Sequence, residues 1–472
     1  MLRTKVVCTL GPASSSPEVV LAMVRSGMDL ARVNMSHGTH EDHRRSIEAV
    51  RAASAEVGRP VAVLVDLSGP KIRVGDLARD MELEVDQTVA MVPEGTESAG
   101  EIPTTYASLA REIHKGDLVL LDDGLLELRC VGTKGDHTRL EVVRGGLLKS
   151  RKGINLPTVN ILAPSLTEKD LADLDFALDR EAEYIGLSFV RRPEDIADLK
   201  RRVGGRALVV AKIEKVQALR AIEEILAETD AIMVARGDLG VELPFERVPL
   251  AQKRIIQLSN YYARPVITAT QMLESMIEHA RPTRAEASDV ANAILDGTDA
   301  VMLSGETAVG MYPLQAVEAI VRIGTEIERS GFLERGPRYL TRPGRRARAG
   351  ASLREHAVAA ATVESVRQLG APAIIVITRS GFSARLVSSY RPSVPVFAVT
   401  TDPATYRQLA AVWGIRPVLA EGVEVSYASL AAFGRDRVRE SGVGEPGASV
   451  VITAGVPFHE SGTTNTMRLE RL

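Results

Sequence analysis

Short apolar segments alternate with amphipathic segments along most of the chain, and this alternation limits the possible folds more than any other feature. Eight apolar segments have the length and β-branched composition of buried strands; they cover residues 5–10, 29–34, 61–67, 184–189, 207–213, 231–235, 265–269 and 300–304. Helical patterns follow most of them, near residues 18–27, 41–57, 193–203, 215–228, 246–263, 284–296 and 313–328, and a capping box at residues 167–170 opens another helix. Strands that alternate with helices pair in parallel, so eight units predict an α/β fold with a closed (β/α)8 barrel, a TIM barrel.

One interval interrupts the alternation. Residues 70–163 lack helical periodicity and carry short strand patterns such as "DLVLL" and "TRLEVV", separated by turn signals. They predict a small β-barrel domain inserted after the third barrel strand. A second α/β pattern, with strands near 373–378, 394–399 and 448–453 and a final strand in "TTNTMRLERL", predicts a third domain. The predicted division is barrel (1–69), inserted β domain (70–163), barrel (164–333) and C-terminal α/β domain (334–472).

Composition narrows the class of protein. A formal net charge of −3 gives no reason to expect nucleic acid or an anionic membrane as partner. The basic stretch 334–354 is predicted to be a solvated linker, because few aromatic residues accompany its charges. Two cysteines without paired spacing argue against a disulfide framework or a thiolate metal site, and no apolar run is long enough to span a membrane. A cytoplasmic protein is predicted.

Polar residues gather where the predicted barrel strands end, which is where barrel enzymes place their catalytic groups. A single carboxylate at a strand end usually caps the next helix, but seven polar strand ends are costly to a packed core. The segment "VVAKIEK" is the most informative of them. Lys212 and Glu214 lie two residues apart in a strand pattern, so their side chains are predicted to project side by side.

Glu214 and Asp238 follow neighbouring strands and have no cysteine or histidine nearby. Two carboxylates without nitrogen or sulfur ligands suit Mg²⁺ or Mn²⁺. The alternative is a salt bridge from Glu214 to Lys212 or Lys215. The metal is favoured because Asp238 lies in "RGDLG", whose glycines leave backbone N–H groups free to meet an anion.

Lys212, Arg32 and Arg73 add three cations to this end of the barrel. A metal with convergent Lys and Arg suits phosphoryl transfer, because the transferred group spreads negative charge over its oxygens. Neither a Walker A sequence nor a kinase-type glycine-rich signature is present in the sequence. A nucleotide would therefore bind in some other way.

Together these motifs resemble the pyruvate kinase family over almost the whole chain. The resemblance rests on "CTLGPAS", "RVNMSHG", "GPKIR", "KGINLP", "KIE", "MVARGDLG", "ATQMLESM", "MLSGETA", "YRP" and "GTTN", in this order. It implies transfer of a phosphoryl group from phosphoenolpyruvate to ADP, giving pyruvate and ATP, the last step of glycolysis. It also implies a β lid after the third strand, a C-terminal regulatory domain and a homotetramer.

The resemblance assigns roles to individual residues. Glu214 and Asp238 match the divalent-metal ligands, and Lys212 matches the lysine beside the transferred phosphoryl group. Thr270 matches the threonine near the substrate carboxylate and the enolate carbon, where it is expected to orient water. Arg32 and Arg73 match arginines that contact phosphates, and Ala235, Gly237 and Asp238 match the loop against the substrate carboxylate. Around a monovalent cation, the matching residues are Asn34, Ser36 and Asp66. In the lid, Arg151 and Lys152 match basic residues that reach the nucleotide.

The segment "VDLSGPKIR" departs from the common family pattern "DTKGPEIR". Leu67, Ser68 and Lys71 stand at the Thr, Lys and Glu positions. The family's Glu lies near a required K⁺, and a fixed ammonium can replace a bound monovalent cation. We therefore predict that Lys71 makes K⁺ unnecessary and leaves a remnant of the cation site. The alternative is that Lys71 turns outward at the lid hinge.

A strand-to-helix turn in the last domain, "TRSGFS", carries Thr378, Arg379, Ser380, Gly381 and Ser383. Hydroxyls and N–H groups at a helix N-terminus can bind an anion, or can simply cap the helix. The resemblance favours a phosphorylated allosteric effector. AMP, a sugar monophosphate and fructose 1,6-bisphosphate all remain open as its identity.

Two other functions are considered. A metal-dependent pyruvate aldolase or lyase also grips an enolate with Glu, Asp and Mg²⁺, but it needs neither a lid nor Lys212. A non-catalytic metabolite sensor would be expected to lack Lys212, Glu214 or Asp238, and all three are present.

Overall fold

The computed structural model describes residues 2–335, 353–457 and 463–472 and contains the predicted barrel. Eight parallel strands close into a barrel in the order β1-β2-β3-β12-β13-β14-β15-β16. Their bounds are β1 Lys5–Thr9, β2 Leu30–Asn34, β3 Ala62–Asp66, β12 Tyr184–Leu187, β13 Leu208–Ile213, β14 Ala231–Ala235, β15 Val266–Ala269 and β16 Ala300–Leu303. The predicted fold class is confirmed.

Helices cover the barrel because each buries one apolar face against the strands. They are α1 Pro17–Ser26, α2 His40–Val57, α4 Glu168–Asp179, α5 Pro193–Val203, α6 Val216–Arg220, α7 Ile222–Glu228, α9 Val248–Tyr261, α10 Arg284–Asp296 and α12 Pro313–Arg329. The capping box before α4 is confirmed: the Thr167 hydroxyl accepts from the backbone N–H of Asp170, and the Asp170 carboxylate accepts from that of Thr167. The prediction of a single helix at 215–228 is wrong, because the chain leaves helical geometry at Ala221, between α6 and α7.

The inserted region leaves the barrel after β3 and returns before α4. A six-stranded sheet has the order β11-β7-β8-β9-β5-β6, and a separate two-stranded sheet pairs β10 with β4. Their bounds are β4 Met81–Leu83, β5 Thr88–Pro93, β6 Ile102–Thr104, β7 Leu118–Leu121, β8 Leu126–Lys134, β9 His137–Arg144, β10 Gly146–Leu148 and β11 Ile154–Asn155, with the short helix α3 at Leu109–Glu112.

The insert is rich in strands, as predicted for the small β-barrel domain, and its strands are divided between these two sheets. The chain turns away after β9 at Gly145, where a Cβ would lie 2.1 Å from the Leu83 carbonyl oxygen. This close approach directs β10 onto β4, so β10 does not continue the larger sheet.

The C-terminal domain is a five-stranded sheet of order β19-β18-β17-β20-β21, with only β21 antiparallel to its neighbour. Its strands are β17 Ile374–Ile377, β18 Val396–Thr400, β19 Ile415–Leu419, β20 Ser449–Ala454 and β21 Thr466–Arg471, with helices α13 Leu353–Leu369, α14 Phe382–Ser388, α15 Pro403–Gln408 and α16 Tyr427–Glu440. β19 was not predicted. Most of the linker predicted at 334–354 lies outside the described residues.

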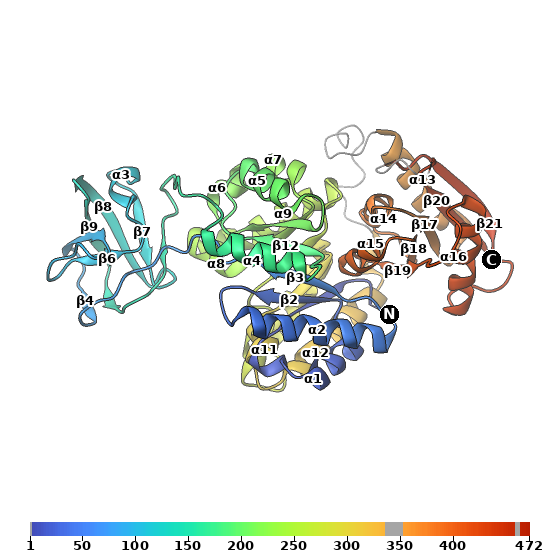
Figure 1. The fold of residues 1–472 in the computed structure, drawn as a ribbon, viewed down its shortest axis with the longest axis horizontal. Coiled ribbons are helices and arrows are strands. Elements are labelled where there is room, and N and C mark those ends of the chain that lie inside the picture. Colours follow the sequence, from blue (N-terminus) through green and yellow to red (C-terminus); the bar gives the residue numbers. More distant parts are fainter. Residues whose placement is uncertain (1, 336–352, 458–462) are drawn as a thin grey trace.

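The three parts lie in a row, with the lid and the C-terminal domain at opposite ends of the barrel (Figure 1). The C-terminal domain contacts the residues that precede the barrel strands: Arg391 pairs with Asp299 at 2.9 Å, and Arg407 pairs with Glu183 at 2.5 Å. The lid rises from the strand ends on the other side. None of the helices in the described residues is long and apolar enough to cross a membrane.

Candidate active site

Lys212 and Glu214 project together from the end of β13, as the strand period predicts. Lys212 Nζ lies 2.9 Å from Glu214 Oε1, and both residues are buried. The salt bridge considered from the sequence is thus present between these two residues. Lys215 takes another partner, Glu242, at 2.6 Å.

Lys212 is held from three sides. Besides Glu214, its Nζ donates to Ser188 Oγ at 2.7 Å and lies 3.2 Å from Asp66 Oδ1. Burial would lower the pKa of Lys212, but the Asp66 and Glu214 carboxylates outweigh burial, and the pKa is raised. The ammonium therefore stays charged at the floor of the site.

Arg32 lies beside Lys212 through a shared carboxylate. Its guanidinium reaches Asp66 Oδ2 at 2.6 Å and donates to the Thr9 hydroxyl at 3.1 Å. Burial opposes ionisation of Asp66, but Lys212 and Arg32 more than compensate and lower its pKa. Lys212 and Arg32 therefore converge on one buried anion at this end of the barrel, where both cations can meet an anionic substrate.

Glu214 and Asp238 lie close enough to influence each other. Burial raises the pKa of Glu214, the Lys212 ammonium opposes this shift, and the Asp238 carboxylate adds to it. Glu214 Oε2 accepts the backbone N–H of Phe189 at 2.8 Å. Asp238 is exposed, beside a cavity of about 690 Å³ that Asp123 of the lid also lines. A buried and an exposed carboxylate therefore meet near the lid–barrel cleft.

Asp238 and Gly237 lie in a short helix, α8 (Arg236–Glu242), where a loop was predicted. Two glycines make this helix weak by propensity, but Leu239 and Glu242 are buried and hold it by packing. The predicted free N–H of Gly237 is also wrong for this structure. It donates to the Thr270 hydroxyl at 2.8 Å. Ala235, also predicted here, ends β14 and is buried.

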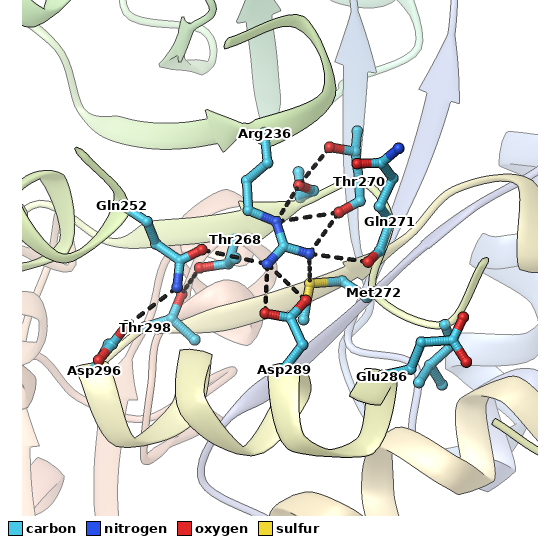
Figure 2. A network of polar contacts seen from close by, with 12 residues as sticks. Arg236, Gln252, Thr268, Thr270, Gln271, Met272, Glu286, Asp289, Asp296 and Thr298 are labelled. Carbon is cyan, nitrogen blue, oxygen red and sulfur yellow. Dashed lines mark hydrogen bonds and ion pairs between the residues drawn. The ribbon is translucent and has the colours of Figure 1, made fainter. Parts of the chain in front are cut away.

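Thr270 lies in a strained turn that Arg236 clamps (Figure 2). Thr270 has φ +67° and Gln271 φ +54°, values that β-branched residues in particular avoid. The Arg236 guanidinium donates to both carbonyl oxygens, at 2.7 and 3.1 Å, and pairs with Asp289 at 2.7 Å. This clamp fixes the Thr270 hydroxyl, which donates to the Ala269 carbonyl at 2.7 Å.

Lys71 is an exposed residue, but the charged groups of the site influence the pKa of its ammonium. Partial desolvation lowers the pKa of Lys71; Asp238 opposes this, while Lys212 and Arg73 add to it. The Arg73 side chain donates to the Arg151 carbonyl at 3.0 Å, within the lid. Lys71 therefore lies within electrostatic reach of the two carboxylates.

The two lid cations predicted to meet a nucleotide are engaged inside the lid. Arg151 pairs with Asp76 and with Glu94, the latter at 3.2 Å, and Lys152 pairs with Asp122 at 2.9 Å. The two pairs of Arg151 are exposed, and the pair of Lys152 is half-exposed. Such pairs are worth little in water, so they can be exchanged for a phosphate.

The residues expected around a monovalent cation differ in which of their polar groups remain available to an ion. Asn34 and Ser36 lie at the end of β2, with the Ser36 N–H donating to Asn34 Oδ1 at 3.2 Å. The Leu67 side chain is buried in the core and leaves only its carbonyl near the site, accepting from Ser188 Oγ at 2.7 Å. Asp66 is occupied by Arg32 and Lys212.

The turn predicted to bind an effector precedes α14. Ser380 is half-buried and Arg379 exposed, whereas Thr378 is buried. The buried Ser383 hydroxyl lies 2.6 Å from Thr464 Oγ1 and is bonded inside the domain. Gly381 has φ +74°, and the half-buried Arg385 donates to the Ser380 carbonyl at 3.1 Å.

Three contributors escaped the sequence reasoning: Ser188, Thr9 and Arg236. All three lie at or just after strand ends, which is the signal that could have found them. Ser188 and Thr9 carry no charge, so nothing in their residue type separates them from ordinary strand-end residues.

Comparisons with known proteins agree with this geometry. A family model described as "Pyruvate kinase, barrel domain" matches residues 1–317, and one described as "Pyruvate kinase, alpha/beta domain" matches residues 356–470. The chain belongs to the pyruvate kinase family. The family predicted from the sequence motifs is confirmed, and the chain is a phosphotransferase. The aldolase alternative finds no support.

Curated relatives span the whole chain. A pyruvate kinase of Mycobacterium intracellulare is 44% identical over 475 residues, covering 100% of this chain and 98% of its own length. One of Geobacillus stearothermophilus is 42% identical and covers 99% of this chain and 80% of its own length. One of Clostridium acetobutylicum is 40% identical and covers 100% and 99%.

Proposed function

We propose that the chain transfers a phosphoryl group from phosphoenolpyruvate to ADP through Lys212 and Arg32, beside a divalent cation held by Glu214 and Asp238. The observation that carries the proposal is the buried cluster in which Lys212 and Arg32 share Asp66 while Lys212 touches Glu214. Both cations are anchored before substrate arrives, so they need little rearrangement to stabilise charge that develops on a phosphoryl group.

The test is a coupled assay for ATP formation from ADP and phosphoenolpyruvate in the presence of Mg²⁺. Formation of ATP is expected. A protein that forms no ATP but releases pyruvate from a larger keto acid would be the metal-dependent lyase. A folded protein that does neither, yet binds phosphoenolpyruvate, would be the metabolite sensor.

Glu214 and Asp238 fit a hard divalent cation, Mg²⁺ or Mn²⁺. Both supply oxygen ligands, and their mutual repulsion, which helps to raise the pKa of Glu214, is what a shared cation relieves. Magnesium is commonly held by one or two carboxylates, with substrate and water completing its shell. When bound, the cation would supply Lewis-acid stabilisation of the substrate's developing enolate.

The protein's own residues supply the other steps. Lys212 faces the phosphoryl group, and Arg32 adds a second positive charge. Gly237, Asp238 and Ala235 form the wall for the substrate carboxylate. Thr270 is too weak an acid to protonate the enolate carbon alone, so its hydroxyl, fixed by the Gly237 N–H, orients a water that delivers the proton.

Nucleotide binding is assigned to Arg73, Arg151 and Lys152. Because Arg151 and Lys152 are paired within the lid, binding requires their carboxylate partners to release them to phosphate oxygens. The lid, which carries Arg151 and Lys152, also contributes Asp123 to the cleft that Asp238 lines. We also propose, from the family resemblance, the domain boundaries given above, a homotetramer, a cytoplasmic location and a C-terminal domain that regulates activity.

Turnover is expected to require Mg²⁺ or Mn²⁺ but not K⁺. Lys71 brings a fixed ammonium within electrostatic reach of Asp238 and Glu214, while Asp66, a residue of the monovalent site, is already occupied by Arg32 and Lys212. Lys71→Glu should lower turnover in K⁺-free tetramethylammonium buffer, and added K⁺ should rescue it at least in part.

The matched control is Lys115→Glu, the same charge change at an exposed lid position. It should leave turnover without K⁺ unchanged. If the unmodified protein gains about tenfold or more from K⁺, a barrier difference of about 1.4 kcal/mol, the role given to Lys71 is wrong.

Ser380→Asp is expected to abolish activation by a phosphorylated effector while turnover at saturating phosphoenolpyruvate survives. The change places negative charge where we propose a phosphate, in a domain on the far side of the barrel from the active site (Figure 1). AMP, sugar monophosphates and fructose 1,6-bisphosphate are screened first for a shift in half-saturation by phosphoenolpyruvate. Ser383 is left intact because its hydroxyl is bonded to Thr464.

The control for this variant is Ser441→Asp, at an exposed serine elsewhere in the same domain. It should respond to the effector normally. Unchanged activation of the Ser380 variant would place the effector somewhere else.

A further inference from the structure

Behind the proposed metal ligands lies a second, buried ion pair that the reaction does not use. Lys215 Nζ lies 2.6 Å from Glu242 Oε1, and the two side chains are 8% and 0% exposed. Lys215 directly follows Glu214, and Glu242 lies one turn beyond Asp238 on α8. The pair therefore joins the end of β13 to the C-terminal end of the helix that carries the other carboxylate.

The same lysine contacts the residue that holds Glu214. Lys215 Nζ lies 5.4 Å from the centroid of the Phe189 ring, within the range of a cation–π contact. Phe189 has φ +55°, and its backbone N–H donates to Glu214 Oε2 at 2.8 Å. A positive φ is unfavourable for an aromatic residue, so neighbouring contacts must hold this turn.

A second contact fixes the Phe189 ring from the opposite chain segment. A Cβ at Gly69 would lie 2.7 Å from the ring, so only glycine lets the two segments approach this closely. The Phe189 ring thus lies within contact of Gly69 and Lys215, and Glu242 fixes Lys215 in turn.

We propose that Lys215 and Glu242 are positioning residues that set Glu214 and Asp238 at the spacing a divalent cation needs. One end of the pair steadies Phe189, which orients Glu214 through its N–H. The other end anchors α8, which carries Asp238. Glu242 Oε1 pairs with Lys215, while Oε2 is buried without a hydrogen-bond partner among the described residues, so loss of the lysine would remove the ion-pair partner of a buried carboxylate.

The inference rests on the proposed metal site, and the experiment separates the two. Binding of Mn²⁺ is measured by the electron paramagnetic resonance signal of the free ion, with full-length protein and no substrate. Lys215→Met and Glu242→Gln are each expected to weaken Mn²⁺ binding by about tenfold or more, as loss of groups that orient metal ligands typically does. At saturating Mn²⁺, kcat should change much less than the metal half-saturation.

Each single change leaves one buried charge unpaired, which can impair folding. The double variant Lys215→Met with Glu242→Gln removes both charges, so it leaves no unpaired buried charge to impair folding. Because the two residues act as one unit, its Mn²⁺ binding should be weakened about as much as in either single variant, well short of the product of both effects. Lys215→Arg keeps the cation and should recover part of the affinity.

The matched control is Lys200→Met, which breaks the 2.8 Å pair of Lys200 with Asp230 elsewhere on the barrel. Its Mn²⁺ binding should equal that of the unmodified protein. Folded double and single variants with unchanged Mn²⁺ affinity would overturn the positioning role. Failure of the unmodified protein itself to bind Mn²⁺ would overturn the proposed metal site, and the positioning role with it.

Discussion

Replacing Lys212 with methionine is expected to lower the rate of phosphoryl transfer by about 10³-fold while the fold is kept, a loss typical of removing one transition-state electrostatic contact. Methionine roughly preserves the length of the side chain and removes its charge. The ammonium lies between Asp66, Glu214 and the Ser188 hydroxyl, so no other cation can move into its place without displacing these contacts.

Binding of the divalent cation should survive this change. Lys212 competes with the cation for Glu214, so its loss leaves the carboxylate more available. Arg32 still neutralises Asp66, at 2.6 Å, which limits the electrostatic cost of losing the lysine. The measurements are kcat in the coupled assay and Mn²⁺ binding without substrate.

Lys5→Met provides the control for burying methionine in place of a lysine. Lys5 is also buried in the barrel, but it lies at the opposite end and donates to the Ile415 carbonyl at 2.9 Å. This variant should keep kcat close to that of the unmodified protein. ATP production near the normal rate by the Lys212 variant would refute the role assigned to it.

The sequence predicts the barrel well because its strands are buried on both faces and therefore read as unbroken apolar runs. The sequence also predicts that the side chains of Lys212 and Glu214 are neighbours, since the period of two in a strand needs no tertiary information. What it cannot predict is Asp66 as the partner shared by Lys212 and Arg32. That contact depends on the closure of the barrel, which brings β2, β3 and β13 to one end.

Two elements show the limit of local patterns. α8 contains two glycines, which favour a loop, but burial of Leu239 and Glu242 outweighs the low helix propensity of this segment. The pattern of the insert predicts a small β-barrel domain but not the separate pairing of β10 with β4, where the backbone of Gly145 closely approaches Leu83. The sequence suggests only Glu214 as a partner for Lys215, because Glu242 lies 27 residues further along the chain.

The second large effect is expected from Glu214→Gln. Glutamine keeps the shape of the side chain and an oxygen that can accept the Phe189 N–H, but it removes the charge that attracts the cation. Mn²⁺ binding without substrate should weaken by about 100-fold or more, since loss of groups that merely orient a ligand already costs about 10- to 100-fold. Turnover at fixed, subsaturating Mg²⁺ should fall in parallel.

The dependence of Mn²⁺ binding on pH distinguishes a lost ligand from a damaged fold. Burial raises the pKa of Glu214, and a cation must bind the deprotonated carboxylate, so affinity in the unmodified protein should fall as pH decreases. Glutamine has no proton to lose, and the variant's weak binding should depend less on pH. Glu183→Gln is the control, because Glu183 is equally buried but pairs with Arg51 at 2.9 Å at the other end of the barrel. If Glu214→Gln binds Mn²⁺ as tightly as Glu183→Gln and with the same pH dependence as the unmodified protein, then Glu214 serves only as the salt-bridge partner of Lys212, and the cation is held elsewhere.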